Sequence, residues 1–191
     1  MTTGAHLPAF GWSSLRAAGA ALAALLLAAA AVGQPSREYD LKAVFLYNFA
    51  TFVDWPESAF PGPDTPFVIG VLGDDPFGAA LDEIVAGERV KNRPLAVRRC
   101  RDLAEARACH ILFISASERD RLREVLRDMA GRPILTVADV PRFVESGGMI
   151  GFSTGARVQL HVNAGAVRNS GLTISSKLLR VAVVREVAAT P

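Results

Sequence analysis

The sequence predicts a single α/β domain with a mostly parallel central sheet, mixed at one end, and helices on both faces. Short apolar runs alternate with helical patterns along most of the chain, an order typical of right-handed β-α-β crossovers. The first of these runs, Phe67–Leu72, is broken only by a glycine, as in strands buried on both faces. Two later runs, Met149–Phe152 and Val158–Val162, are joined by a four-residue turn segment that predicts an antiparallel hairpin.

The segment before this domain has the pattern of a secretory signal. Arg16 precedes Ala17–Val32, which holds no charge and is nearly all Ala and Leu, and small residues follow. We therefore expect residues 1–33 to be a cleavable signal peptide, cut near Ala31 or Gly33, and residues 34–191 to form the exported domain. The alternative is an uncleaved anchor, but the apolar run has 16 residues, short of the ~20 that span a bilayer.

Composition limits the function classes. The chain has 191 residues, enough for one domain, with 50% hydrophobic and 21% charged residues. Without residues 1–33, which hold one Arg and no acid, 20 basic residues face 19 acidic ones, a net charge of +1. So small a charge gives no electrostatic footprint for nucleic acid.

The first helix is predicted over Glu38–Val53. It is apolar nearly all round, so it is either buried or covered by a partner, and it could form a dimer interface. Trp55-Pro56 ends it, because the residue before a proline disfavours helix. Residues 57–66 are proline-rich and predict a loop.

Strands and helices then alternate. The strands expected after that loop are Phe67–Leu72, Leu95–Arg99, Ile111–Ile114 and Ile134–Val137. Three helices are expected between them. The first starts at an Asp75 cap with Pro76 in first position, and the second covers residues 102–107. The third runs from a Ser115/Glu118 capping box to Met129.

The remaining elements are short. Asp139 and Pro141 predict a short helix that ends at Gly147-Gly148. After the hairpin, Asn163 is expected to cap a helix to Asn169, and Ser175 or Ser176 to cap another through Arg180.

Six stretches of this chain resemble one known family in the same order. They are EYDLKAVFLYNF (38–49), FVDWP (52–56), IGVLGDDPFG (69–78), CHILFIS (109–115), GGMI (147–150) and ISSKLL (174–179). The chain thus resembles the YfiR family of bacterial periplasmic proteins from about Glu38 to about Val184. No single stretch is specific, but their order is a strong signal.

The resemblance implies a periplasmic regulatory protein rather than an enzyme. It implies binding to the extracytoplasmic domain of an inner-membrane signalling enzyme, a diguanylate cyclase above all, whose repression lowers cyclic-di-GMP. It further implies a homodimer and sensitivity to disulfide state, and no cofactor. This chain has only two cysteines, whereas the best-known member has two disulfides.

Cys100 and Cys109 follow one predicted strand and precede the next. In an exported protein with an even number of cysteines we expect a disulfide between them, and the alternative is two free buried thiols. Their number and spacing do not suit a zinc site, which needs four ligands in close pairs.

A crevice at the carboxyl ends of the strands is the default site for a small-molecule effector. Asp74, Asp75, Ser115 and Ser117 would gather there if the strand order allows. The simpler interpretation of Gly73-Asp74-Asp75 is a tight strand-to-helix turn, since it lacks the Lys-Ser/Thr of a phosphate-binding loop.

Two further residues are candidate contacts, and one histidine and three arginines have structural explanations. His161 shares the polar face of a half-buried strand with Arg157 and Gln159, and with Lys177 it is a candidate contact for a partner or ligand. His110 opens an apolar strand and is expected to be a satisfied core residue. Arg119, Arg123 and Arg127 interleave with acids at helical spacing, which predicts a solvated face with i,i+4 ion pairs.

Two functions from different classes follow. The first is the periplasmic regulator that represses a membrane enzyme by contact. The second is a small-ligand-binding periplasmic module for sensing or transport that uses the strand-end crevice. A hydrolase has the least support, because no catalytic constellation is present.

Overall fold

The computed structural model describes residues 35–155 and 157–185, and those from Glu38 onward belong to one compact unit. The expected signal peptide, residues 1–33, lies outside the described residues. The order of elements along the chain determines which side chains can meet at each edge of the sheet.

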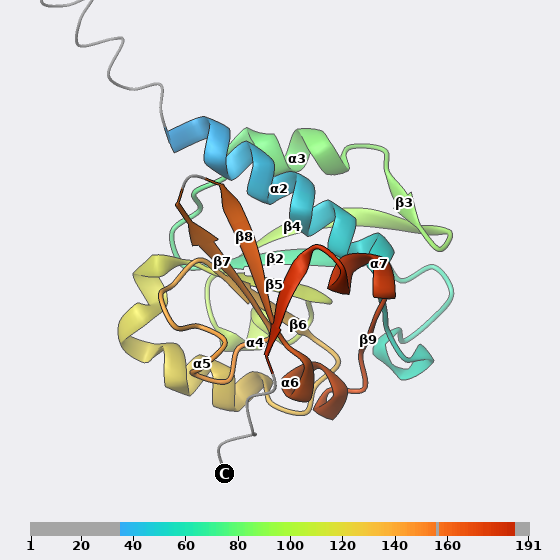
Figure 1. Ribbon diagram of the computed structural model, residues 1–191. Coiled ribbons are helices and arrows are strands. Elements are labelled where there is room, and N and C mark those ends of the chain that lie inside the picture. The colour runs from blue at the N-terminus through green and yellow to red at the C-terminus, as the bar shows by residue number, and fades with distance from the viewer. Residues whose placement is uncertain (1–34, 156, 186–191) are drawn as a thin grey trace, which may run out of the picture. The chain divides into compact units, whose positions relative to one another are not determined.

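The central sheet has eight strands in the order β10-β8-β7-β6-β5-β2-β4-β3 (Figure 1). Their bounds are β2 Phe67–Leu72, β3 Arg89–Val90, β4 Arg93–Cys100, β5 Ile111–Ile114, β6 Leu135–Ala138, β7 Ile150–Thr154, β8 Val158–Asn163 and β10 Ala182–Arg185. Strands β4, β2, β5, β6 and β7 run parallel, and β8 is antiparallel to β7. The predicted hairpin and the mostly parallel sheet are confirmed.

Both ends of the sheet depart from the parallel arrangement. The antiparallel hairpin β3–β4 forms one edge, and β10 returns parallel to β8 to form the other. A separate two-stranded sheet pairs β1 (Val53–Asp54) with β9 (Thr173–Ile174). None of β1, β3, β9 and β10 was predicted from the sequence.

Six α-helices are described. They are α2 Pro35–Phe52, α3 Ala79–Val85, α4 Leu103–Ala106, α5 Leu122–Met129, α6 Ala164–Asn169 and α7 Ser176–Leu179. The caps predicted for the last two are confirmed: the Asn163 side chain accepts from the Ala166 amide, and the Ser175 side chain accepts from the Lys177 amide.

Alternating side chains of the inner strands build two cores, one on each face of the sheet. In β2, Phe67, Ile69 and Val71 face the core that contains α2 and α3, while Val68 and Leu72 face the core that contains α4 and α5. Helices therefore cover both faces, as predicted, and Figure 1 shows the two sets on opposite sides.

The predicted helix start after β2 is wrong. Asp75 does not cap a helix. Its carboxylate accepts from the Phe77 amide in a turn, and α3 begins only after Gly78. The reason is that Gly78 has φ 55° and ψ −132°, which no helix can include.

The predicted capping box and the helix at Asp139 are also wrong. The Ser115 side chain makes no cap bond, the chain first forms a 3₁₀ helix, η2 (Ala116–Arg121), and Glu118 pairs with Arg121. Residues 141–147 form turns rather than a helix. Asp139 caps nothing there because its carboxylate accepts from Tyr39 and Lys42 of α2.

Candidate functional site

The carboxyl ends of β2 and β5 meet as predicted, but the space between them is filled. The Asp74 amide donates to Ser117 Oγ at 2.9 Å. A Cβ on Gly73 would come within 2.4 Å of the same Oγ, so the turn after β2 and the start of η2 are in tight contact. Ser115 is buried beside them.

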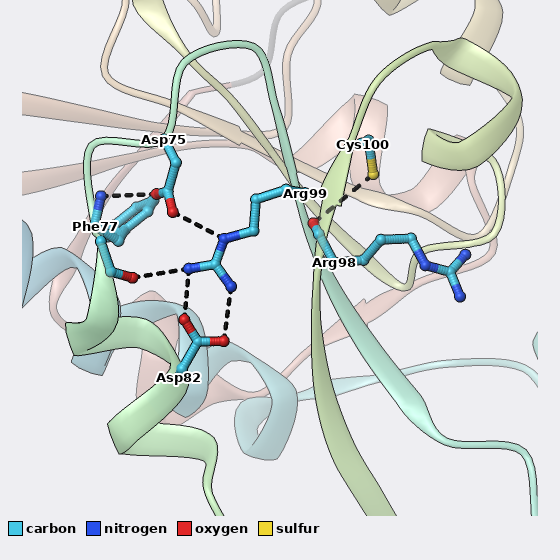
Figure 2. Close-up of polar contacts among 7 residues, drawn as sticks. Asp75, Phe77, Asp82, Arg98, Arg99 and Cys100 are labelled. Carbon is cyan, nitrogen blue, oxygen red and sulfur yellow. Dashed lines mark hydrogen bonds and ion pairs between the residues drawn. The ribbon is translucent and has the colours of Figure 1, made fainter.

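Asp75 is committed to an ion-pair network rather than to a crevice. Figure 2 shows Arg99, near the end of β4, with its Nε 2.8 Å from Asp75 Oδ2 and its terminal nitrogens on both oxygens of Asp82. The bidentate hydrogen bonds from Arg99 hold the pKa of Asp82 below its usual value. Because the Asp74 amide is bonded to Ser117 and the Asp75 carboxylate to Arg99, we do not assign a ligand site to the predicted crevice.

Cys100 and Cys109 lie against each other beneath α4, as the sequence placed them. Both are buried and free, with their sulfurs 3.6 Å apart, whereas a disulfide requires about 2.05 Å. The expected bridge is thus not formed in this structure. The hydrogen bond between the thiols lowers the pKa of Cys100 and raises that of Cys109, which burial raises further.

Gly70 provides the space for this thiol pair. A Cβ at Gly70 would lie 2.4 Å from Cys109 Sγ and 3.2 Å from Cys100 Sγ. The glycine that interrupts the apolar run of β2 therefore has a packing reason, which the sequence alone did not reveal.

The remaining predicted residues are spread over the molecule. His161 is half-buried on β8 and bonds Ser153 Oγ through Nε2 at 2.8 Å, on the polar face that the sequence predicted. Lys177 is exposed in the first turn of α7. The structure does not bring either residue to the Asp74–Ser117 contact, and their roles stay predictions.

His110 is a core residue, as predicted. Its Nδ1 accepts from the Val68 amide, and its Nε2 donates to the Ala59 carbonyl. The ring stacks on Phe60 and Phe67 at centroid distances of 4.5 and 4.8 Å. Because burial disfavours its charged form, the pKa of His110 is lowered to about 4.

A buried lysine on α2 went unrecognised in the sequence. Lys42 is 1% exposed, and its Nζ lies 2.6 Å from Asp139 and 2.5 Å from Glu38. The signal that could have revealed it is a single lysine between the apolar residues Leu41 and Ala43 of the helix. The contact fastens α2 to the loop after β6.

Exposed large apolar side chains, by contrast, gather on two elements of the described chain. Leu41 and Val44 lie on the outer side of α2, and Val181, Val183 and Val184 lie on or next to β10. β10 is an edge strand, and no described strand pairs with its other side. We call these five residues, one group on α2 and another at β10, the apolar surface; exposed apolar groups can mark contact sites.

The sequence of the chain can be compared with known protein families. A family model described as YfiR/HmsC-like matches residues 39–183, most of the chain. The chain belongs to the YfiR/HmsC-like family. The resemblance found in the sequence is thereby confirmed, and YfiR-like proteins are periplasmic regulators rather than known enzymes.

One further comparison and one property of the helices complete this description. No curated protein matches this YfiR/HmsC-like chain significantly. Among the residues that the structure describes, no helix is long and apolar enough to cross a membrane.

Proposed function

We propose that this YfiR/HmsC-like protein is a periplasmic regulator that binds the extracytoplasmic domain of an inner-membrane diguanylate cyclase and represses it, lowering cyclic-di-GMP. The family match supports the regulatory class and the compartment. The observation that carries the contact mechanism is the apolar surface on α2 and β10.

Export is part of the proposal. Residues 1–33 act as a cleaved signal peptide, and the mature domain then meets its partner outside the cytoplasm. A protein in that compartment acts on a membrane enzyme by binding one of its states more tightly than the other, which shifts the population toward the inactive form.

An edge strand and a helix face offer two known modes of protein recognition. Among the described strands none pairs with the outer side of β10, so another strand can add to its backbone groups there, and the α2 face presents side chains at helical spacing. We expect two copies of the protein to pair through their β10 edges in a homodimer, which leaves the exposed face of α2 free to contact the cyclase.

The test measures cyclic-di-GMP in a strain that lacks the gene and expresses the candidate cyclase. Deletion raises cyclic-di-GMP, and the wild-type gene restores the lower level. The variant Leu41→Glu/Val44→Glu fails to restore it, because charged groups on α2 oppose burial against the partner. Thr51→Glu, at an exposed position of the same helix, is the matched control and restores it.

Two outcomes would count against the proposal. Unchanged cyclic-di-GMP on deletion removes the regulatory role. Full repression by the Leu41→Glu/Val44→Glu variant, recovered folded from the periplasm at normal abundance, removes the α2 surface from the contact.

The two thiols belong to the same proposal. In the oxidising periplasm we expect a disulfide between Cys100 and Cys109, because their sulfurs are already in contact and a small rotation of the side chains joins them. Intact mass of the protein isolated from periplasm, before and after reduction, differs by two hydrogen atoms when the bond is present. An unchanged mass contradicts the bond.

A further inference from the structure

A cavity of about 670 Å³ has in its lining none of the five residues of the apolar surface and none of Asp74, Asp75, Ser115 and Ser117. It is bounded by the C-terminal half of α5, the starts of β6 and β7, and α6, elements that Figure 1 shows close together. Its volume falls within the range of about 300–1,000 Å³ that small-molecule sites occupy.

The floor of the cavity is apolar and adaptable. Leu126, Met129 and Met149 line it, and both methionines are almost fully buried. The chain has three methionines in all, and the third is Met1. Methionine side chains adjust to ligands of varied shape because they are unbranched and polarisable.

The polar groups at the base are already satisfied within the protein. Thr136 Oγ1 accepts from the Met149 amide, and Ser170 Oγ donates to the Ala166 carbonyl. The Asn163 side chain accepts from the Ala166 amide and donates to the Val144 carbonyl. The groups left to bind a polar ligand are therefore those at the rim.

The rim carries two arginines whose charge no described acid neutralises. Arg123 and Arg127 of α5 line the cavity, and the only bond among them is from Arg127 Nε to the Arg123 carbonyl. No aspartate or glutamate lines the same cavity.

Two acids of this helical segment pair elsewhere, contrary to the i,i+4 pairing expected from the sequence. Glu118 pairs with Arg121, and Asp128 pairs with Arg107 beside α4. Two guanidinium groups one helical turn apart are thus left over an apolar floor, an arrangement complementary to an anion attached to an apolar body.

A second hollow, of about 600 Å³, continues the first along η2 and shares Arg123 and Ser146 with it. It contains Asp120 as well as Arg119. Because the Asp120 carboxylate repels an anion, we place the charged head of a ligand at the end of the cavity near Arg123 and Arg127.

We propose that this cavity binds a small amphipathic anion. Its apolar body lies on Leu126, Met129 and Met149, and its carboxylate or phosphate group accepts hydrogen bonds from Arg123 and Arg127. The proposal depends on the cavity alone and stands or falls separately from repression of a cyclase.

The experiment is NMR of the mature protein labelled with ¹³C in the methionine methyl groups, titrated with decanoate and, in a second arm, with monodecyl phosphate. Variants Met129→Leu and Met149→Leu assign the two signals. Saturable shifts of both signals are expected with at least one probe, and the arm that saturates first distinguishes the carboxylate from the phosphate head. Decanol, which has the same chain and no charge, is expected to bind about tenfold more weakly or worse.

Arg123→Gln/Arg127→Gln is expected to weaken decanoate binding by about tenfold or more, since it removes both charged donors. Arg98→Gln is the control, because Arg98 is an exposed arginine of β4 without an ion pair; it leaves binding unchanged. The proposal is overturned if neither methionine signal shifts below the micelle concentrations of the two probes. Equal binding of decanol, or equal binding by the double arginine variant, overturns anion recognition.

Discussion

At the scale of single residues, Gly70 matters because its lack of a side chain leaves the space that the two cysteine sulfurs occupy. The residue lies on the face of β2 that also carries Val68 and Leu72, directly below the two cysteines. Only hydrogen at this position leaves room for both sulfurs.

Gly70→Ala is therefore expected to lower the free energy of unfolding of the reduced protein by about 2 kcal/mol, the usual cost of overpacking a core. Adding Cys109→Ala removes the sulfur that the new Cβ would meet at 2.4 Å, and the double variant regains most of the loss. Urea unfolding under reducing conditions measures both. If the losses of the Gly70→Ala and Cys109→Ala single variants simply add in the double variant, the Cys109 sulfur is not what the new Cβ collides with.

His110 makes stability depend on pH. The pKa of His110 is about 4 in the folded protein, below the 6.5 of an unfolded chain, so the unfolded state binds the proton more readily between these values. The stability contributed by the neutral ring is complete above pH 6.5 and is lost as pH falls toward 4.

We expect acidification from pH 7 to 4.5 to cost the wild type about 2–3 kcal/mol more than it costs His110→Gln, which has no ring to protonate. Urea titrations of both proteins at the two pH values give the difference. Parallel losses in wild type and variant would mean that His110 does not titrate in this range on unfolding.

The sequence predicted the nature of several such residues but not their partners. It gave His110 a place in the core, and it placed the two cysteines on either side of α4. It could not show that Asp75 belongs to Arg99 and Asp82, or that Ser117 closes the crevice on Asp74, because these contacts join elements whose spacing depends on the finished sheet.

At the scale of elements, α2 is held to the sheet by packing and by one buried ion pair. Lys42 contacts Asp139, whose side chain is 9% exposed, and the Tyr39 hydroxyl donates to the same carboxylate. Burial first, and then this hydrogen bond, raise the pKa of Tyr39 to about 12.

Lys42→Met is expected to destabilise the protein by about 3 kcal/mol, because it leaves the Asp139 carboxylate without its cation in a buried place. Asp139→Asn in the Lys42→Met background removes the stranded charge, so the double variant is more stable than the single one. Thermal or urea unfolding compares the two. If Asp139→Asn instead destabilises the Lys42→Met protein further, Lys42 is not what stabilises the charged Asp139 carboxylate.

The elements that the sequence predicted well are those with a clear period or a sharp boundary. β2 and β5 match their predicted limits, since their apolar runs end sharply, one at a Gly-Asp turn and the other at Ser115. β1, β3 and β9 have two residues each, too few to show a period, and β10 forms only because β8 lies beside it. The sequence misplaces the start of α3 because a proline signal is local, whereas Gly78, two residues after Pro76, imposes a different backbone.

At the scale of the whole molecule, the two edges of the sheet differ in their protection. β3 and the turn after it carry Arg89 and Lys91, and charged side chains of this kind discourage pairing with another chain. The exposed residues of β10 are Val183, Val184 and a single charged residue, Arg185. An open, apolar edge suits a two-fold contact in which β10 of one copy pairs with β10 of another.

Val183→Lys is accordingly expected to convert a homodimer into a monomer, because the charge would be buried in the paired edge. Light scattering during gel filtration reports the mass, and Ala86→Lys, at an exposed position after α3, is the control that stays dimeric. A wild-type protein that is monomeric at high concentration, or a Val183→Lys protein that remains dimeric, rules out this edge as the interface.

The central claim is that the protein lowers cyclic-di-GMP from outside the cytoplasm. The most direct measurement is the cyclic-di-GMP content of the deletion strain complemented either with the full gene or with a gene that lacks codons 2–33. We predict that the full gene lowers the content and that the shortened gene, expressed to the same level, does not. Equal lowering by the two genes would place the action in the cytoplasm and contradict the account.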